Sequence, residues 1–256
     1  MLRLAFALAV RHEVLPRNPV DHVARLHRPA STPDALTPAS VDAIRAAVRQ
    51  WETGLIEAGR QPDRQLGQLI EVMLGTSARI GEALALRRCD VDVTSDPPTL
   101  RIAGTVVYRR GEGTVRQDHP KTARSRRTVA LPSFTAEAVR QRLTVMTARD
   151  PEALLFASRN GTPLTTHNVR RQLRHVMQLA GIEGVTPHAF RRTAATAVHE
   201  RVGTQLAAEL LGHTDERITV QHYIRRDERV NAVTAKALDD AFGTGGDSEP
   251  RTAQER

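Results

Sequence analysis

The order of apolar and polar positions predicts amphipathic helices in the first third of the chain. Two segments carry apolar residues three and four positions apart: Val41, Ile44, Val48 and Trp51 in the first, and Leu66, Leu69, Ile70, Met73 and Leu74 in the second. The first helix is expected to begin at Thr37-Pro38, because threonine is a good N-cap and proline suits the first helical turn. We expect the second helix to stop at Gly75 and a third, capped by Ser77, to run through ARIGEALALRR.

Between residues 99 and 132 the pattern changes to an alternation with a period of two, which predicts strands. We expect three short strands, at residues 99–108, 113–117 and 127–132, joined by two turns. Helical spacing then returns at residues 135–147, 166–180, 186–200, 204–211 and 230–242. The sequence therefore predicts an α+β fold, a mostly helical domain with a small three-stranded antiparallel sheet.

The two ends of the chain differ from this central region. Residues 1–15 predict one amphipathic helix with Leu4, Leu8 and Leu15 on its buried side, followed by a linker rich in proline, serine and threonine that ends near residue 35. A single helix cannot bury its apolar face alone, so this piece either packs on the main domain or belongs to something larger. Residues 243–256 have the composition of a disordered tail, which leaves residues 36–242 as the main domain.

The charge balance is basic. Lys and Arg number 37 against 29 Asp and Glu, a formal net charge of +8. Most of the basic residues are arginine, whose planar guanidinium group binds phosphates in a bidentate manner. The chain is therefore a candidate nucleic-acid binder. The alternative is a basic protein from an organism whose proteins are rich in arginine.

The cysteine content and the N-terminal sequence exclude several classes of protein. Cys89 is the only cysteine, which excludes an intrachain disulfide and a metal site built from several cysteines. Charged residues interrupt the apolar start of the chain, and no long uncharged run follows. We therefore expect neither a signal peptide nor a membrane span, and predict a cytoplasmic location.

One segment, residues 186–225, combines cationic groups, imidazoles and a phenol. It contains four of the ten histidines and one of the two tyrosines. His188 and Arg191 lie three positions apart on one predicted helix, so both can reach the same ligand. His213 follows the glycine that ends the next helix, and Tyr223 lies further along the chain. A phenol among cations indicates chemistry on a phosphate.

Two cationic residues far from this segment are candidates for the same site. Arg79 is expected at the start of a helix, where backbone N–H groups favour an anion. Lys121 is expected at the tip of a turn between two strands, with its ammonium group free to reach away from the sheet.

Five motifs carry a family resemblance. They are TSARIGEALAL (76–86), PKTARSRRTVALP (120–132), HAFRRTAAT (188–196), LLGH (210–213) and YIR (223–225). In this order they resemble the tyrosine recombinases, also called phage-type integrases, over residues 36–242. Five motifs of distinct residue types in the right order form a specific signal, although each alone would be weak.

The resemblance implies site-specific DNA recombination by strand cleavage and rejoining through a 3′-phosphotyrosine intermediate. The implied catalytic residues are Arg79 and Arg191 as clamps on the non-bridging phosphate oxygens, His188 and His213 as hydrogen-bond donors, Lys121 as the acid for the departing 5′ oxygen, and Tyr223 as the nucleophile. Glu82 resembles an acidic position that supports the site. The implied partners are double-stranded DNA and three further copies of the chain, in a homotetramer on synapsed sites, with no cofactor, metal, membrane or small-molecule substrate.

The chain departs from the family pattern at three places. The interval from His213 to Tyr223 is at the longer end of what the resemblance implies. Arg192 follows Arg191 where many relatives have histidine; the His-x-x-Arg register makes Arg191 the clamp and leaves Arg192 for the DNA backbone. Residues 1–35 resemble only the last helix and exit linker of a core-binding domain, which suggests a shortened integrase. One alternative is therefore a truncated, non-catalytic DNA-binding remnant of an integrase. A type IB topoisomerase is a third possibility, but the missing clamp and the LLGH motif fit integrases better.

Several residues also have plainer interpretations. Arg124 and Arg126 could bind backbone phosphate in place of Lys121. Tyr108 ends a strand with no imidazole nearby and is expected to be a core tyrosine. We assign His199 and His222 to structure, and disfavour zinc because the histidines have no paired thiol or carboxylate. The helix at residues 230–242, with Val233, Ala237 and Leu238 on one face, could dock on a neighbouring protomer or pack on its own domain.

Overall fold

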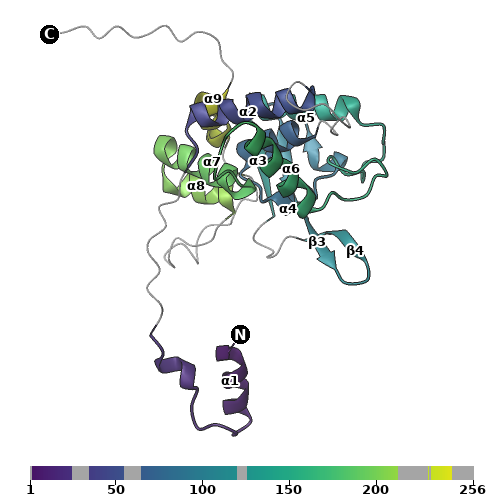
Figure 1. Ribbon diagram of the computed structural model, residues 1–256. Helices are drawn as coiled ribbons and strands as arrows, with labels where there is room; N and C mark the ends of the chain where they lie inside the picture. Colours follow the sequence, from purple (N-terminus) through teal and green to yellow (C-terminus); the bar gives the residue numbers. More distant parts are fainter. Residues whose placement is uncertain are drawn as a thin grey trace, which may run out of the picture. The chain divides into compact units, whose positions relative to one another are not determined.

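The computed structural model describes residues 2–24, 35–54, 65–119, 126–212, 230 and 232–243. Contacts divide the chain into two units, Met1–Pro33 and Asp34–Arg256 (Figure 1). The division falls close to the linker end expected near residue 35. The resemblance of the first unit to part of a core-binding domain stays a prediction, and the predicted tail lies, apart from Gly243, outside the described residues.

The first unit consists of helix α1 (Leu2–Arg11) and the short 3-10 helix η1 (Pro19–His22). Asn18 joins them: its amide donates to Arg3 O at 2.9 Å, and its Oδ1 accepts from Val20 N at 3.0 Å. The predicted buried face of α1 is wrong within this unit, because no residue of α1 is buried and Leu4 is 75% exposed. A unit of two short helices offers too little surface to cover these leucines.

The second unit is built around helix α3 (Leu66–Thr76), which is buried along almost its whole length. In Figure 1, α3 lies at the centre, with α2 and α9 above it and α7 and α8 to one side. The other helices are α2 (Pro38–Glu52), α5 (Ser133–Val145), α6 (Thr166–Leu179), α7 (Pro187–Val202), α8 (Thr204–Leu211) and α9 (Val233–Phe242). The predicted Thr37 cap is confirmed, since its side chain accepts from Ser40 N at 3.1 Å. None of the described helices combines the length and apolarity needed to cross a bilayer.

Helix α3 approaches α5 closely at Gly75. A Cβ atom on Gly75 would lie 1.9 Å from Thr135 Oγ1, so a larger residue cannot fit without displacing α5. The hydroxyl of Thr135 donates to Glu71 O at 3.1 Å, which fixes the contact. The helix continues one residue past Gly75, and Ser77 then takes a left-handed conformation (φ 53°) as its C-cap. The prediction that Ser77 caps the following helix is therefore wrong.

The predicted α+β fold is confirmed, but the strands pair differently from the prediction. The three-stranded antiparallel sheet has the order β1 (Val91–Asp92), β2 (Thr99–Ile102), β5 (Arg127–Ala130). Strands β3 (Thr105–Arg109) and β4 (Gly113–Gln117) form a separate hairpin that projects from the domain (Figure 1). The single strand predicted at residues 99–108 is thus two strands. The break falls at Gly104, where a Cβ atom would lie 2.7 Å from Gln117 O.

The hairpin packs on the domain only near its base. A Cβ atom on Gly81, in the short helix α4 (Ile80–Ala83), would lie 2.8 Å from Thr105 Oγ1 and 3.2 Å from Val106 O. The start of β3 therefore packs directly on the backbone of α4. Tyr108 lies further out and is 77% exposed. The prediction that Tyr108 is a core tyrosine is therefore wrong.

Helix α9 packs on its own domain, against α7, α5 and α2. Ala237 and Leu238 are buried as predicted, whereas Val233 is 46% exposed. The Asp239 carboxylate accepts from Ser133 N at 2.7 and 2.8 Å, at the start of α5. Arg45 of α2 is buried: it donates to Phe242 O at 2.7 Å and forms a bidentate pair with Glu71 at 2.7 and 2.8 Å.

Candidate active site

Arg79 is the N-cap residue of helix α4 (Ile80–Ala83), which is much shorter than the predicted helix. Glu82, one turn later, accepts from Arg79 N at 3.0 Å and from Arg79 Nη1 at 2.8 Å. The Glu82 side chain is 3% exposed and the Arg79 side chain 46%. Arg79 is therefore held at its base by a buried carboxylate, while part of its guanidinium group faces solvent.

His188 and Arg191 both belong to α7, which begins with Thr186 as N-cap and Pro187 in its first turn, as predicted. Arg191 is 2% exposed. It donates to Ser77 O at 2.5 Å and to Leu211 O at 2.7 Å. The left-handed turn at Ser77 and the end of α8 thus fix the guanidinium group between two backbone carbonyls.

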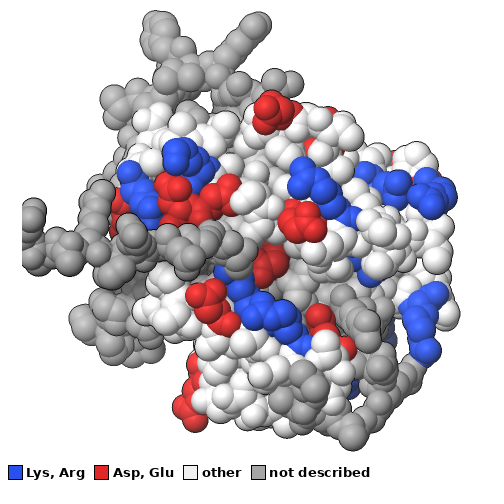
Figure 2. Space-filling model, turned by 90° about the horizontal axis from the view of Figure 1, so that it is seen from above, with Lys and Arg blue, Asp and Glu red and all other residues white. Residues whose placement is uncertain are grey.

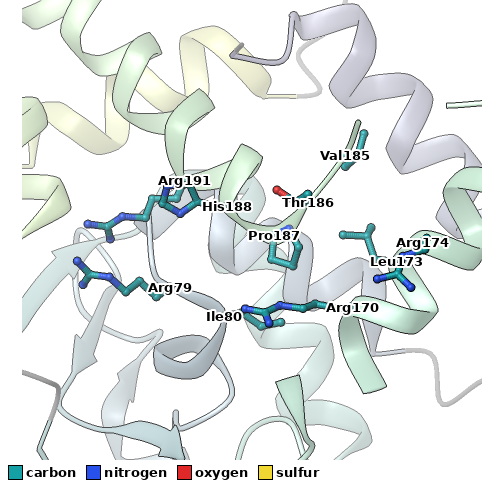
Figure 3. Close-up of a pocket in the computed structure, with 10 residues that line it drawn as sticks. All are labelled: Arg79, Ile80, Arg170, Leu173, Arg174, Val185, Thr186, Pro187, His188 and Arg191. Atoms are coloured by element: carbon teal, nitrogen blue, oxygen red, sulfur yellow. The ribbon is translucent and has the colours of Figure 1, made fainter. Parts of the chain in front are cut away.

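A pocket of about 430 Å³ brings these groups together (Figure 3). Arg79, His188 and Arg191 lie at one end, with both guanidinium groups pointing to the same side. Arg170 and Arg174 come from α6: Arg170 reaches toward Ile80 in the middle of the view, and Arg174 lies at the other end. The remaining lining residues are Ile80, Leu173, Val185, Thr186 and Pro187.

The pocket is strongly cationic. Its lining contains four arginines and a histidine but no carboxylate. On the face of the second unit drawn in Figure 2, by contrast, basic and acidic side chains are interspersed. Glu82, which pairs with Arg79 at 2.8 Å, lies behind this lining and not in it. Guanidinium groups gathered on one surface favour binding of an anion, above all a phosphate.

Burial and the neighbouring positive charges shift the pKa values of Arg191 and His188. Burial, together with the cations Arg79 and Arg127, lowers the pKa of Arg191 to about 9, although Glu82 opposes the shift. Arg191 therefore remains a cation at neutral pH. Burial and three neighbouring arginines lower the pKa of His188 below its ordinary value of 6.5. His188 is then a neutral imidazole at pH 7 and can donate one hydrogen bond.

The structure brings three of the six predicted catalytic residues, Arg79, His188 and Arg191, around one pocket. The other three, Lys121, His213 and Tyr223, lie outside the described residues. The catalytic roles of all six stay predictions. Within the described ranges, no three His, Cys, Asp or Glu side chains gather in an arrangement that could hold a metal ion.

Three cationic residues at or beside the pocket were missed from the sequence. Arg170 and Arg174 are four positions apart on α6, a spacing that places them on one helix face and could have indicated a shared ligand. Arg127 is 4% exposed and lies beside Glu82. Only Arg124 and Arg126 of that basic stretch were considered, because the burial of one arginine among several cannot be read from the local sequence.

Comparison with known proteins gives the family. The model of the phage integrase family matches residues 36–229. Among curated relatives, "Tyrosine recombinase XerA" of Thermococcus kodakarensis is 28% identical over 216 residues, which cover 80% of this chain and 65% of the relative. The "Integrase" of Mycobacterium phage L5 is 26% identical over 243 residues, 91% of this chain and 59% of the relative.

Solved structures share the fold. The Tn1549 transposon integrase in complex with transposon right end DNA aligns with a TM-score of 0.70 at 19% identity, over 91% of this chain and 75% of that one. A lambda integrase tetramer bound to a Holliday junction aligns with a TM-score of 0.55 at 17% identity, over 88% of this chain and 59% of that one.

This chain belongs to the phage integrase family, because the family model matches most of its length. It spans somewhat under two thirds of the length of these two curated relatives.

Proposed function

We propose that this chain cuts and rejoins double-stranded DNA at specific sites through a 3′-phosphotyrosine link to Tyr223. The observation that carries the proposal is the arginine-rich pocket whose lining includes Arg79, His188 and Arg191. Membership of the phage integrase family supports it.

The proposed reaction has two transfers that balance without an external energy source. Tyr223 loses its phenolic proton to water, its oxygen attacks the phosphorus of the scissile phosphodiester, and the 5′ oxygen leaves with a proton from Lys121. A 5′ hydroxyl of the partner strand then attacks the phosphotyrosine and releases the tyrosine. Tyrosine has an ordinary pKa near 10, so its attack depends on cations and a base that favour removal of the proton.

The pocket residues suit the charge that develops on the phosphorus. Arg79 and Arg191 offer guanidinium donors to the non-bridging oxygens, with the charge of Arg79 partly offset by Glu82. Arg191 needs no reorganisation because two carbonyls already fix it. Fixed donors aimed at a developing charge contribute roughly 100- to 1000-fold in rate each. The neutral imidazole of His188 supplies a further hydrogen bond. Arg170 and Arg174, which line the same pocket, are suited to the phosphate next along the strand.

The proposed partners are duplex DNA and further copies of the chain, as a tetramer on two synapsed sites. The DNA-bound transposon integrase and the lambda integrase tetramer on a Holliday junction support this assembly by their shared fold. Helix α9 packs on its own domain in the single chain. The cytoplasmic location stays a prediction.

The test is covalent capture of DNA by the full chain. The probe is a pool of end-labelled duplexes, each with a single nick and a randomised sequence around it, so that a cleaved short strand diffuses away and traps the intermediate. Wild-type protein is expected to retain label after denaturation in detergent, and Tyr223→Phe to lose it while still shifting the same duplexes in a gel. Binding by wild-type protein without any adduct would contradict the proposal and favour the non-catalytic alternative.

A further inference from the structure

Arg127, the first residue of β5, is buried between two parts of the site. Its side chain is 3% exposed, and its Nη2 lies 3.5 Å from Glu82 Oε2. On another side it contacts Gly212, where a Cβ atom would lie 3.3 Å from Arg127 Nη1. Gly212 closes α8 in a left-handed conformation with φ 63°. One guanidinium group thus lies beside both the carboxylate that holds Arg79 and the turn that ends α8.

The Glu82 carboxylate divides its oxygens between the two arginines. Oε1 accepts from Arg79 Nη1 at 2.8 Å, whereas Oε2 accepts from Arg79 N at 3.0 Å and faces Arg127 Nη2. Burial alone would raise the pKa of Glu82, but the charge of Arg127 and the bonds from Arg79 hold it below the ordinary value. Arg127 thus adds a buried positive charge beside Glu82 Oε2, and Glu82 holds the Arg79 side chain through Oε1.

Strand β5 also lies against the two residues that flank residues 213–229, Gly212 and Val230. Gly212 lies against Arg127, and Val230 N donates to Thr128 O at 2.7 Å. The consecutive residues Arg127 and Thr128 are thus the anchor points on either side of that stretch.

We infer that Arg127 is a positioning residue of the phosphate site: it fixes the Glu82–Arg79 arm and the Gly212 turn relative to each other without touching the phosphate. This inference rests on the proposed function for its effect on DNA cleavage. Its effect on anion binding is independent of any cleavage activity, because an anion needs only the oriented arginines.

The test compares Arg127→Met with Arg101→Met, which removes an exposed arginine from the neighbouring strand of the same sheet. Sodium sulfate serves as the phosphate mimic, and isothermal titration calorimetry in sodium chloride at constant ionic strength gives its affinity directly, because sulfate also raises unfolding midpoints without binding. We expect Arg127→Met to weaken sulfate binding about 10-fold or more, the range typical of residues that orient the ligands of a site. A purely structural role would lower the unfolding midpoint and leave the sulfate affinity unchanged.

Coupling to Glu82 provides the second readout. If Arg127 acts through Glu82, the double variant Arg127→Met/Glu82→Gln loses no more sulfate affinity than the worse single variant, because the two effects are not additive. Arg127→Lys, which keeps the charge but cannot span both contacts, is expected to be intermediate and serves in place of Arg127→Met if that variant does not fold. The inference would be overturned if the tested Arg127 variant bound sulfate with an affinity within twofold of that of Arg101→Met.

Adduct formation separates this inference from the proposed function. If wild-type protein forms the adduct, Arg127→Met is expected to slow it about 10- to 100-fold with little change in duplex binding. Adduct formation by Arg127→Met at the Arg101→Met rate would overturn the inference and leave the proposed function intact. If wild-type protein forms no adduct, the proposed function fails, and the sulfate comparison alone decides the role of Arg127.

Discussion

Replacing Glu82 by glutamine should lower the stability of the fold, because Glu82 is the carboxylate that pairs with both Arg79 and Arg127. Glu82 is 3% exposed and is the carboxylate that faces Arg79 and Arg127, the latter 4% exposed. Glutamine keeps the shape but removes the charge, which leaves the Arg127 cation buried against another cation. Breaking a buried pair by removal of one partner costs about 3–5 kcal/mol. For a domain of this size that corresponds to a fall in the unfolding midpoint of roughly 6–20 °C.

Urea unfolding followed by circular dichroism gives the free-energy difference, and Glu112→Gln is the matched control. Glu112 also pairs with an arginine, Arg109 at 3.3 Å, but both side chains are about half exposed or more. Exposed pairs contribute about 0–1 kcal/mol, so the control should change stability little. Equal losses of stability in the two variants would refute the reasoning.

The contribution of Glu82 to the stability of the fold should decrease at acidic pH. The folded-state pKa of Glu82 lies below its ordinary value of 4.5, so its stabilisation is fully present above pH 4.5 and is lost as the pH falls through the folded-state value. The stability gap between wild-type protein and Glu82→Gln should therefore be constant near neutral pH and shrink below pH 4.5. A gap that widens on acidification would contradict this assignment.

Three further predictions follow from contacts elsewhere in the second unit. Gly75→Ala should destabilise the fold by about 1–3 kcal/mol, because its Cβ atom would collide with Thr135, whereas Gly67→Ala on the same helix should be neutral or stabilising in urea unfolding. Arg45→Met should cost about 3 kcal/mol, since it leaves a partly buried carboxylate and the end of α9 without their donor; thermal unfolding and protease sensitivity of the C-terminal helix would measure it. In an NMR titration His188 should have a pKa below 6.5 that rises on addition of sulfate, because the anion offsets the surrounding cations.

Each of these three predictions has a control, either a second variant of the chain or a second salt. Arg49→Met, one turn further along α2 at an exposed position, should leave stability within about 0.5 kcal/mol of wild type. A loss equal to that of Arg45→Met would argue against the buried network. Equal destabilisation by Gly75→Ala and Gly67→Ala would argue against the close approach of α3 and α5. Sodium chloride at matched ionic strength should shift the His188 pKa less than sulfate does; an equal shift would indicate screening rather than anion binding.

The helical framework could be predicted from the sequence because its signals are local. Thr37 marks a helix start by its side-chain cap, and Pro187 marks another by its place in the first turn. The three-residue spacing of His188 and Arg191 places both on one face of α7. Arg79 does lie at a helix start as predicted, although the cap predicted for that helix, Ser77, ends the preceding one.

What could not be predicted depends on contacts between distant segments. The alternating pattern runs straight through Gly104, and only the close approach of Gln117 O shows that the chain changes sheets there. Tyr108 has the apolar neighbours of a core residue but lies on a hairpin that extends beyond the domain. Arg127 is one of several arginines in a basic stretch, and its burial depends on Glu82 and Gly212, which lie 45 residues before it and 85 residues after it.

The most direct test of the proposed function is to identify the residue that carries the DNA. The chain contains only two tyrosines, Tyr108 and Tyr223, so digestion of the covalent adduct followed by mass spectrometry gives an unambiguous answer. We predict a nucleotide attached to the peptide that contains Tyr223 through the tyrosine oxygen, present in wild-type protein and in Tyr108→Phe and absent in Tyr223→Phe. A nucleotide on Tyr108, or an adduct that persists in Tyr223→Phe, would contradict the assignment of Tyr223 as the nucleophile.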